Sequence, residues 1–296
     1  MVNPELEHTE WAWGEVETIP CDLCGGTEHR MEVEEGAFRM VRCSACGLVF
    51  CNPRPTRQEL LRFYNEYFVP SSEELWEEQM RRPFRKEGVD FLTRVTRPGR
   101  VLDVGCGHGF FLDMMRSAGW ETAGVEPSPA AARHAVEKLG LSVFCGVVED
   151  APFEPGSFDA ATLWYVLEHV PNPSEVLGTV ARLVRPGGHV IVRVPNRNVA
   201  VDRWLARLGS LGRRHFLINP PRHLYDYDSR TLRGLLEKTG FEVLTMGNAA
   251  PRSAGSALQR VRRRMWYWKS ELVRALTAGR RLSGSSIVAY GRRVGT

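Results

Sequence analysis

The chain has 296 residues, which is enough for one large domain and a small additional one. Its composition, 43% apolar and 25% charged residues, is typical of a water-soluble globular protein and excludes a low-complexity chain. The net charge of +4 is uneven, because eleven Arg or Lys and only one acid follow residue 249. No apolar run is long enough to span a membrane, and the N-terminus lacks a secretory signal pattern, so we expect a cytoplasmic protein.

Two C-x2-C pairs mark residues 1–55 as a small separate module. The four cysteines are Cys21, Cys24, Cys43 and Cys46, and a glycine follows each pair. Two such turns bring four thiolates to one tetrahedral site, which favours zinc. A site filled by four protein ligands has no open position, so we expect a structural zinc ribbon, with Cys51 packed outside it.

Residues 56–97 favour a helical cap or linker. Thr56 and Glu59 have the spacing of a capping box at a helix start. The stretch that begins at residue 70 suits a long helix that Pro83 interrupts.

From residue 98 onward, apolar runs alternate with helix-like segments. We expect strands at 101–104, 122–125, 142–145, 159–164, 188–194, 241–246 and 285–292. This alternation predicts an α/β domain over 98–296, with a mostly parallel sheet covered by helices on both faces. The segments 195–227 and 249–284 break the alternation and are expected to be insertions within that domain.

The first of these strands leads into the glycine-rich stretch VLDVGCGHGFF at 101–111. A dinucleotide fingerprint needs a third glycine where Phe110 stands, and no Lys-Ser/Thr pair follows as in a P-loop. Glu126 ends the next strand, where a carboxylate can accept both ribose hydroxyls. The turn therefore predicts an adenosine ligand, with Cys106 as a small packing residue and His108 in a positional role.

These motifs resemble those of class I S-adenosylmethionine (SAM) methyltransferases. VLDVGCGHGFFL is similar to their first motif, AGVEPS to their second, and RLVRPGGHVIVRVPN to a later turn and strand. The resemblance implies a Rossmann-like seven-stranded sheet, SAM as the cofactor and methyl transfer as the reaction. The N-terminal CDLCGG and VRCSACGLVFCNPRPT resemble a subset with a zinc ribbon, several of which act in antibiotic, sugar or cell-envelope pathways.

The resemblance also implies a cofactor site along the ends of the strands. The implied cofactor-binding residues are Tyr67, Asp103, Gly105, Gly107, Glu126, Pro127, Val148, Glu149 and Trp164. Glu126 would hold the ribose, Trp164 would lie near the sulfonium, and Tyr67 with Tyr64 would cap the cofactor. The aspartate that often reads the adenine amino group is replaced by Val147, so Glu149 or the backbone near Val148 would make that contact.

Methyl transfer is an in-line displacement that requires alignment of the acceptor and exclusion of water. An oxygen or carbon acceptor also needs a base, for which histidine suits neutral pH. The resemblance places His169 and His223 beside the acceptor, where each is either a base or a structural residue. Ubiquinone-pathway O-methyltransferases have a similar E-x-x-E-H stretch that can hold a metal, but Tyr165 replaces the first acid here, which argues against a catalytic metal.

The two insertions are candidate binding segments, and the sequence does not identify what they bind. Segment 195–227 carries Trp204 and several leucines near one helical face and could form a lid over the substrate. Within segment 258–281, residues 260–276 carry Trp266 and Trp268 among six cations. This pattern fits a membrane surface or a lipid-linked substrate, a nucleic acid, or aromatic side chains packed on the domain.

The sequence thus predicts a SAM-dependent methyltransferase that acts on a small-molecule acceptor from natural-product, sugar or lipid-linked chemistry, by O-methylation with a histidine base. Two alternatives stay open. One is an RNA methyltransferase that uses the ribbon and the basic C-terminal segment, although the Asn/Asp-Pro-Pro-Phe/Tyr motif of many base-methylating enzymes is absent. The other is a non-catalytic SAM-binding docking module.

Overall fold

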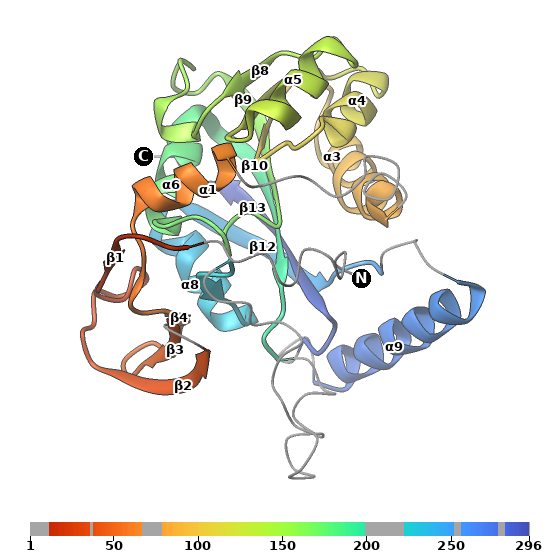
Figure 1. The fold of residues 1–296 in the computed structure, drawn as a ribbon. Helices are drawn as coiled ribbons and strands as arrows, with labels where there is room; N and C mark the ends of the chain where they lie inside the picture. Colours follow the sequence, from red (N-terminus) through yellow and green to blue (C-terminus); the bar gives the residue numbers. More distant parts are fainter. Residues whose placement is uncertain are drawn as a thin grey trace.

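A computed structural model describes residues 12–35, 38–66, 79–198, 222–251, 256–277 and 282–295. Its centre is a seven-stranded sheet (Figure 1). In spatial order the strands are β12 (Phe241–Asn248), β13 (Ser286–Arg293), β10 (Val184–Pro195), β9 (Phe158–Trp164), β6 (Arg100–Val104), β7 (Glu121–Glu126) and β8 (Val143–Cys145). Only β13 runs antiparallel to its neighbours, so the predicted mostly parallel, seven-stranded sheet is confirmed.

Helices cover both faces of this sheet because its central strands are apolar on both sides. On β6, Val101 packs with one group of helices and its neighbour Leu102 packs with the other. The first group is η2 (Phe84–Val89), α3 (Asp90–Val95), α4 (Phe110–Ser117) and α5 (Pro129–Glu137). The second group is α6 (Pro173–Leu183) and α8 (Ser229–Lys238). Figure 1 shows the sheet between these two groups.

The helical segment before the sheet differs from the prediction at its first turn. Thr56 Oγ1 accepts a hydrogen bond from Glu59 N at 3.4 Å, just before α1 (Arg57–Glu66). Glu59 does not complete the capping box, because its carboxylate accepts from Gly14 N at 2.9 Å. Thr56 N donates instead to Glu15 O. The chain that leads into β1 (Val16–Glu17) thus replaces half of the expected cap.

The helix is interrupted at Pro83, as the sequence predicts, by a change of helix type. Pro83 has helical torsion angles, φ −52° and ψ −52°, and the helical residues 79–83 continue into η2, which is a π-helix, and then into α3. A proline cannot donate to the preceding turn, and its ring crowds the carbonyl four residues earlier. The helix therefore changes its hydrogen-bonding type near Pro83.

The cysteine-rich module forms a four-stranded antiparallel sheet with a strand from far along the chain. β2 (His29–Glu35), β3 (Phe38–Cys43) and β4 (Val49–Cys51) are joined by β11 (Tyr225–Asp226), while β1 pairs with β5 (Arg54–Pro55). The sheet therefore crosses the boundary expected at residue 55. Most of the segment 195–227, including Trp204 and its leucines, lies outside the described residues.

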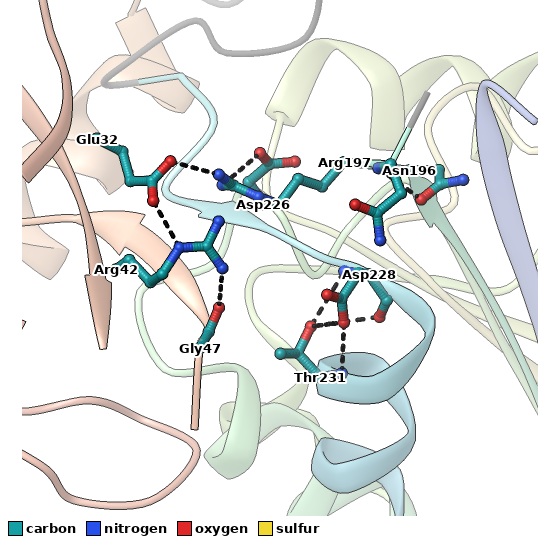
Figure 2. A network of polar contacts seen from close by, with 9 residues as sticks. Glu32, Arg42, Gly47, Asn196, Arg197, Asp226, Asp228 and Thr231 are labelled. Atoms are coloured by element: carbon teal, nitrogen blue, oxygen red, sulfur yellow. Dashed lines mark hydrogen bonds and ion pairs between the residues drawn. The ribbon is translucent and has the colours of Figure 1, made fainter. Parts of the chain in front are cut away.

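Charged side chains fix this module against the large domain (Figure 2). Glu32 of β2 accepts from Arg42 at 2.5 Å and from Arg197 at 2.6 Å, and Arg197 also bonds Asp226 at 3.2 Å. Burial raises the pKa of Glu32, but Arg42 and Arg197 outweigh it, so the pKa lies below its usual value. The network joins β2, β3, β11 and the residues that follow β10.

A second charged network lies inside the large domain. Arg193 on β10 and Glu87 in η2 form an ion pair at 2.5 Å, with side chains that are 2% and 5% exposed. Arg193 also donates to Ala250 O at 2.8 Å, and Glu87 accepts from Ala250 N. Arg193 Nε donates to Tyr165 Oη at 2.8 Å. The pair therefore links the sheet, the π-helix and the residues after β12.

Replacing Glu87 by Gln leaves the Arg193 guanidinium buried without a counter-charge. Loss of one partner from a buried pair costs about 3 kcal/mol or more. We expect Glu87→Gln to lower the free energy of unfolding by about this amount in urea denaturation. Glu242→Gln, which breaks an exposed pair with Arg292, should cost less than about 1 kcal/mol. Equal losses for the two variants would contradict this account.

Candidate functional site

The turn after β6 brings bare backbone to the carboxyl edge of the sheet. Gly105, Gly107 and Gly109 have φ values of +69°, +55° and +89°, which glycine adopts without strain. A Cβ at Gly105 would lie 2.7 Å from a methyl group of Val166, so only glycine lets the turn approach the loop after β9. Gly109 also begins α4, whose first N–H groups favour a ligand rich in acceptor atoms.

The predicted ribose-binding acid is held by this turn. Glu126, at the end of β7, accepts from Gly107 N at 2.8 Å and from Ser128 N at 2.9 Å. Burial raises the pKa of Glu126, and these two backbone N–H groups oppose the rise. Each carboxylate oxygen keeps a second lone pair, which is the acceptor capacity that two ribose hydroxyls require.

A second buried acid lies beneath the turn. Asp103 accepts a hydrogen bond from Thr162 Oγ1 at 2.5 Å. Burial raises the pKa of Asp103 to about 8; the bond from Thr162 opposes this rise and the charge of Glu126 adds to it. A bound cation would favour the ionised form of such an acid. The methionine end of a SAM molecule, with its sulfonium and ammonium groups, is a ligand of this kind.

The remaining predicted cofactor residues lie on neighbouring elements. Pro127 is half-buried after β7, and Val148 is buried in the short 3-10 helix η3 (Val148–Asp150). The Glu149 side chain is 15% exposed and lies 4.0 Å from Arg57 of α1. Burial raises the pKa of Glu149.

The aromatic candidates have different surroundings. Trp164 is 4% exposed and packs between Phe84 and Phe111, with ring centroids 5.2 Å and 5.1 Å away. Its role at the sulfonium therefore stays a prediction. Tyr67 lies outside the described residues. For Tyr64 on α1, burial raises the pKa of the phenol, and the charges of Glu126 and Glu168 raise it further.

The two other residues of the glycine turn that the sequence singled out make packing contacts. Cys106 is buried with Leu112 and lies against Gly124 of β7. The His108 ring packs edge-on against His134 at 4.8 Å.

Three polar side chains meet just after β9. Glu168, His169 and His223 each offer a ligand atom, and these atoms lie within 4.8 Å of one another. His169 Nδ1 is 2.7 Å from the carbonyl oxygen of Arg222, so Nδ1 carries the proton and Nε2 keeps a lone pair. His169 Nε2 lies 4.0 Å from Glu168 Oε1. Burial and the neighbouring His223 lower the pKa of His169 to about 3, which keeps the imidazole neutral.

His223 reaches this position through the cysteine-rich module. Cys51 N of β4 donates to Leu224 O at 2.7 Å, and Leu224 N donates to Glu168 O at 2.7 Å. The next residue, Tyr225, pairs with Phe50 in the sheet. The segment that carries His223 is thus held between the module and the loop of Glu168.

Tyr165, which replaces the first acid of the E-x-x-E-H pattern, does not join this group. It has φ +61°, which is uncommon for a residue with a side chain. Its hydroxyl accepts from Arg193 Nε at 2.8 Å and lies 3.0 Å from Ser286 Oγ. His223 supplies a third donor beside Glu168 and His169 that no local pattern reveals, so a tyrosine at position 165 does not by itself exclude a metal here.

The four predicted cysteine ligands form one cluster. Sγ atoms of Cys21 and Cys46 are 3.5 Å apart, as are those of Cys24 and Cys43, and all four lie within 4.8 Å of one another. A tetrahedral zinc with Zn–S bonds of about 2.3 Å separates its sulfurs by about 3.8 Å, so the cluster fits this ion. Cys51 is buried outside the cluster and donates to Pro53 O.

Removal of this metal should loosen the segment of His223. Without the ion the knuckles lose their cross-link, and β4 loses its fixed position beside β11. We expect Cys24→Ser, or treatment with a strong chelator, to lower the melting temperature and to speed amide exchange at Leu224 and Cys51. Amides in β6 and β7 serve as internal controls and should exchange as before. Unchanged protection at Leu224 in metal-free protein would contradict the coupling.

Comparison with known proteins agrees with this geometry. Residues 76–246, more than half of the chain, match a family model described as a methyltransferase domain. The ubiquinone biosynthesis O-methyltransferase of Thiobacillus denitrificans is 40% identical over 152 residues, which are 49% of this chain and 63% of the relative. The enzyme of the same name from Ralstonia nicotianae is 38% identical over 135 residues, 43% of this chain and 55% of the relative. The matches thus span less than two thirds of either relative.

Solved structures share the fold at low identity. A methyltransferase in complex with the Haloferax volcanii Trm112 activator superposes with a TM-score of 0.53 at 17% identity, covering 76% of this chain and 92% of that one. The [4+2]-cyclase SpnF has a TM-score of 0.53 at 19% identity, covering 82% and 99%. One fold thus serves different reactions, and the site must carry the functional argument. The family match, the motifs and the order of the strands agree with one another. The chain therefore belongs to the methyltransferase domain family, whose cofactor is SAM.

Proposed function

We propose that the chain is a SAM-dependent O-methyltransferase that methylates a hydroxyl group of a small-molecule acceptor. The observation that carries the proposal is the contact between the glycine turn and the loop after β9. Val166 of that loop packs against Gly105, Gly107 of the turn donates to Glu126, and His169 N donates to Val166 O. Ubiquinone biosynthesis O-methyltransferases are 40% and 38% identical to this chain over 152 and 135 residues, which supports oxygen as the acceptor atom.

SAM supplies a methyl group that is activated by the positive charge on sulfur. Glu126 would hold the ribose, and Asp103 with the glycine turn would hold the methionine end. The acceptor oxygen attacks the methyl carbon as the carbon–sulfur bond breaks, which leaves a neutral thioether. His169 Nε2 would take the hydroxyl proton, since the Arg222 carbonyl holds the other ring nitrogen as the donor. The Glu168 carboxylate, 4.0 Å from Nε2, would stabilise the imidazolium that forms and so oppose the low pKa that burial gives this imidazole.

A divalent cation at Glu168, His169 and His223 is a second way to activate the hydroxyl. One carboxylate and two imidazoles form a common ligand set for zinc and transition metals. A cation there would lower the pKa of a bound hydroxyl. Activity that is lost in a mild chelator, while the cysteine-bound zinc stays measurable, and that returns with added Mn²⁺ would favour this route.

Loss of the charge on Glu126 should abolish tight cofactor binding. Hydrogen bonds to a charged group contribute about 1.5–3 kcal/mol each, so loss of the charge should weaken binding about 100-fold. We expect this for Glu126→Gln with S-adenosylhomocysteine in titration calorimetry. Glu121→Gln, an exposed acid at the start of the same strand, should bind as the unaltered protein does. A Kd for Glu126→Gln within threefold of the parent would be evidence against the assigned site.

Loss of the His169 side chain should slow methyl transfer and leave cofactor binding intact. General base catalysis contributes about 100-fold or more, so we expect His169→Ala to lower kcat by at least that factor. The Kd for S-adenosylhomocysteine should not change. His189→Asn, half-buried at the start of the parallel part of β10, is the matched control. Activity of His169→Ala within threefold of the parent rejects the role for this residue.

The two alternatives from the sequence give different results in the same assays. Methyl transfer to RNA, with binding that weakens steeply as salt rises, would replace the small-molecule acceptor. SAM binding without turnover across a panel of hydroxylated acceptors would indicate a docking module.

A further inference from the structure

Helix α9 (Ala257–Leu276) carries an apolar stripe that faces solvent. Twelve large apolar side chains are exposed in the described part of the chain, and six of them lie on this helix. They are Leu258 (69% exposed), Val261 (52%), Met265 (58%), Trp268 (67%), Leu272 (59%) and Leu276 (78%). Spacings of three and four residues place them on one side of the helix.

The opposite side of α9 anchors it to the domain. Ser270 is buried, and Glu271 accepts a hydrogen bond from Asn248 Nδ2 of β12 at 3.0 Å. The Lys86 ammonium lies 5.9 Å from the ring centroid of Tyr267. The helix is therefore held by contacts that leave the stripe facing away from the protein. Figure 1 shows α9 at the margin of the molecule. Of the two tryptophans, Trp266 is half-buried, whereas Trp268 is exposed.

The charge on the helix has one sign. It contains the cations Arg260, Arg262, Arg263, Arg264, Lys269 and Arg274, against the single acid Glu271. At 100° per residue, Arg262 and Lys269 lie along one border of the stripe and Arg264 lies along the other, and all three are exposed. Glu271 is paired with Arg274 at 2.8 Å. The surface beside the stripe is thus complementary to anions.

We propose that α9 docks on an anionic lipid membrane and lies in the plane of its surface. The six apolar side chains would enter the boundary of the acyl chains, and the bordering cations would meet the lipid phosphates. Among the described residues, no helix has the length and apolar character needed to cross a membrane.

Charge and chemistry favour a membrane over two other occupants. A second copy of the chain that packed along the stripe would place the cations of one helix beside those of the other, and such like-charge contacts are destabilising. A nucleic acid would suit the cations, but five of the six stripe residues are aliphatic and offer no ring for base stacking. An anionic bilayer accommodates both the stripe and its cationic borders.

The position of α9 relates docking to the site. β13 is antiparallel to both β10 and β12, so β12 runs in the same direction as the parallel strands. The carboxyl end of β12, which precedes α9 in the chain, therefore lies at the edge of the sheet where β6, β7 and β9 end at the site residues. Ala250, between β12 and α9, contacts the Glu87–Arg193 pair, which also holds Tyr165. A membrane beneath α9 would therefore lie at the acceptor side of the sheet.

Flotation with vesicles of phosphatidylcholine, with and without phosphatidylglycerol, tests the proposal on the full-length chain. We expect binding only to the anionic vesicles and weaker binding as salt rises. The double variant Trp268→Glu with Leu272→Glu should lower the partition coefficient at least about tenfold. Val136→Glu with Leu244→Glu places the same charges at exposed apolar sites elsewhere and should bind as the parent does. Arg262→Gln with Lys269→Gln should weaken binding and reduce its salt dependence.

Several results would overturn the proposal. These are no binding to anionic vesicles at low salt, equal binding by the stripe variant and its control, or binding to neutral vesicles alone. A dimer in sedimentation that the stripe variant abolishes, without vesicle binding, would assign the stripe to a second copy. Tight RNA binding lost with Arg262→Gln and Lys269→Gln, again without vesicle binding, would assign it to nucleic acid.

Discussion

The pairing of β4 with β11 determines the geometry around Glu168, His169 and His223, the proposed acceptor side of the site. Leu224 uses both of its backbone groups, because its carbonyl accepts from Cys51 N and its N–H donates to Glu168 O. Each bond contributes only about 1 kcal/mol, but together they fix where His223 stands relative to His169. Cys51 follows the second cysteine knuckle by five residues, so the bound metal would fix β4 and, through it, the imidazole pair. On this geometry the cysteine-rich module is part of the site's scaffold.

The sequence predicted the elements whose signals are local. Apolar runs ending at turns predicted the seven strands of the main sheet, and the three glycines predicted the tight turn after β6, because strand periodicity and positive φ leave marks within a few residues. β11 leaves no such mark. Tyr225 and Asp226 form a two-residue strand within PPRHLYDYD, and its partner lies in the first fifty-one residues. A pairing of this range depends on the assembled module, which periodicity does not describe.

The residues of the candidate site also fall into two groups: those that local patterns predict and those that only the fold brings together. Glu126 and His169 follow strand ends, so their positions could be expected from the sequence. Of the Glu87–Arg193 pair, the sequence indicates only Arg193. Arg193 stands inside the apolar run 188–194, and a cation in a buried strand needs a counter-charge. Nothing in the sequence identifies Glu87 as that partner, because it lies in a helix that only the fold brings beneath β10.

Tyr165 and His223 together determine which chemical groups line the proposed acceptor site. Tyr165 presents a neutral hydroxyl to Arg193, whose charge Glu87 already balances, so a second acid there would add an uncompensated negative charge in a buried region. His223 adds an imidazole nitrogen, and no further carboxylate, beside Glu168 and His169. A cation held by these three groups would meet one carboxylate and two nitrogens. Such a donor set favours zinc or a transition metal over Mg²⁺, which prefers oxygen ligands. Compared with the E-x-x-E-H stretch, this chain thus has a tyrosine in place of the first acid, and a second imidazole, that of His223, among the groups that would activate the acceptor.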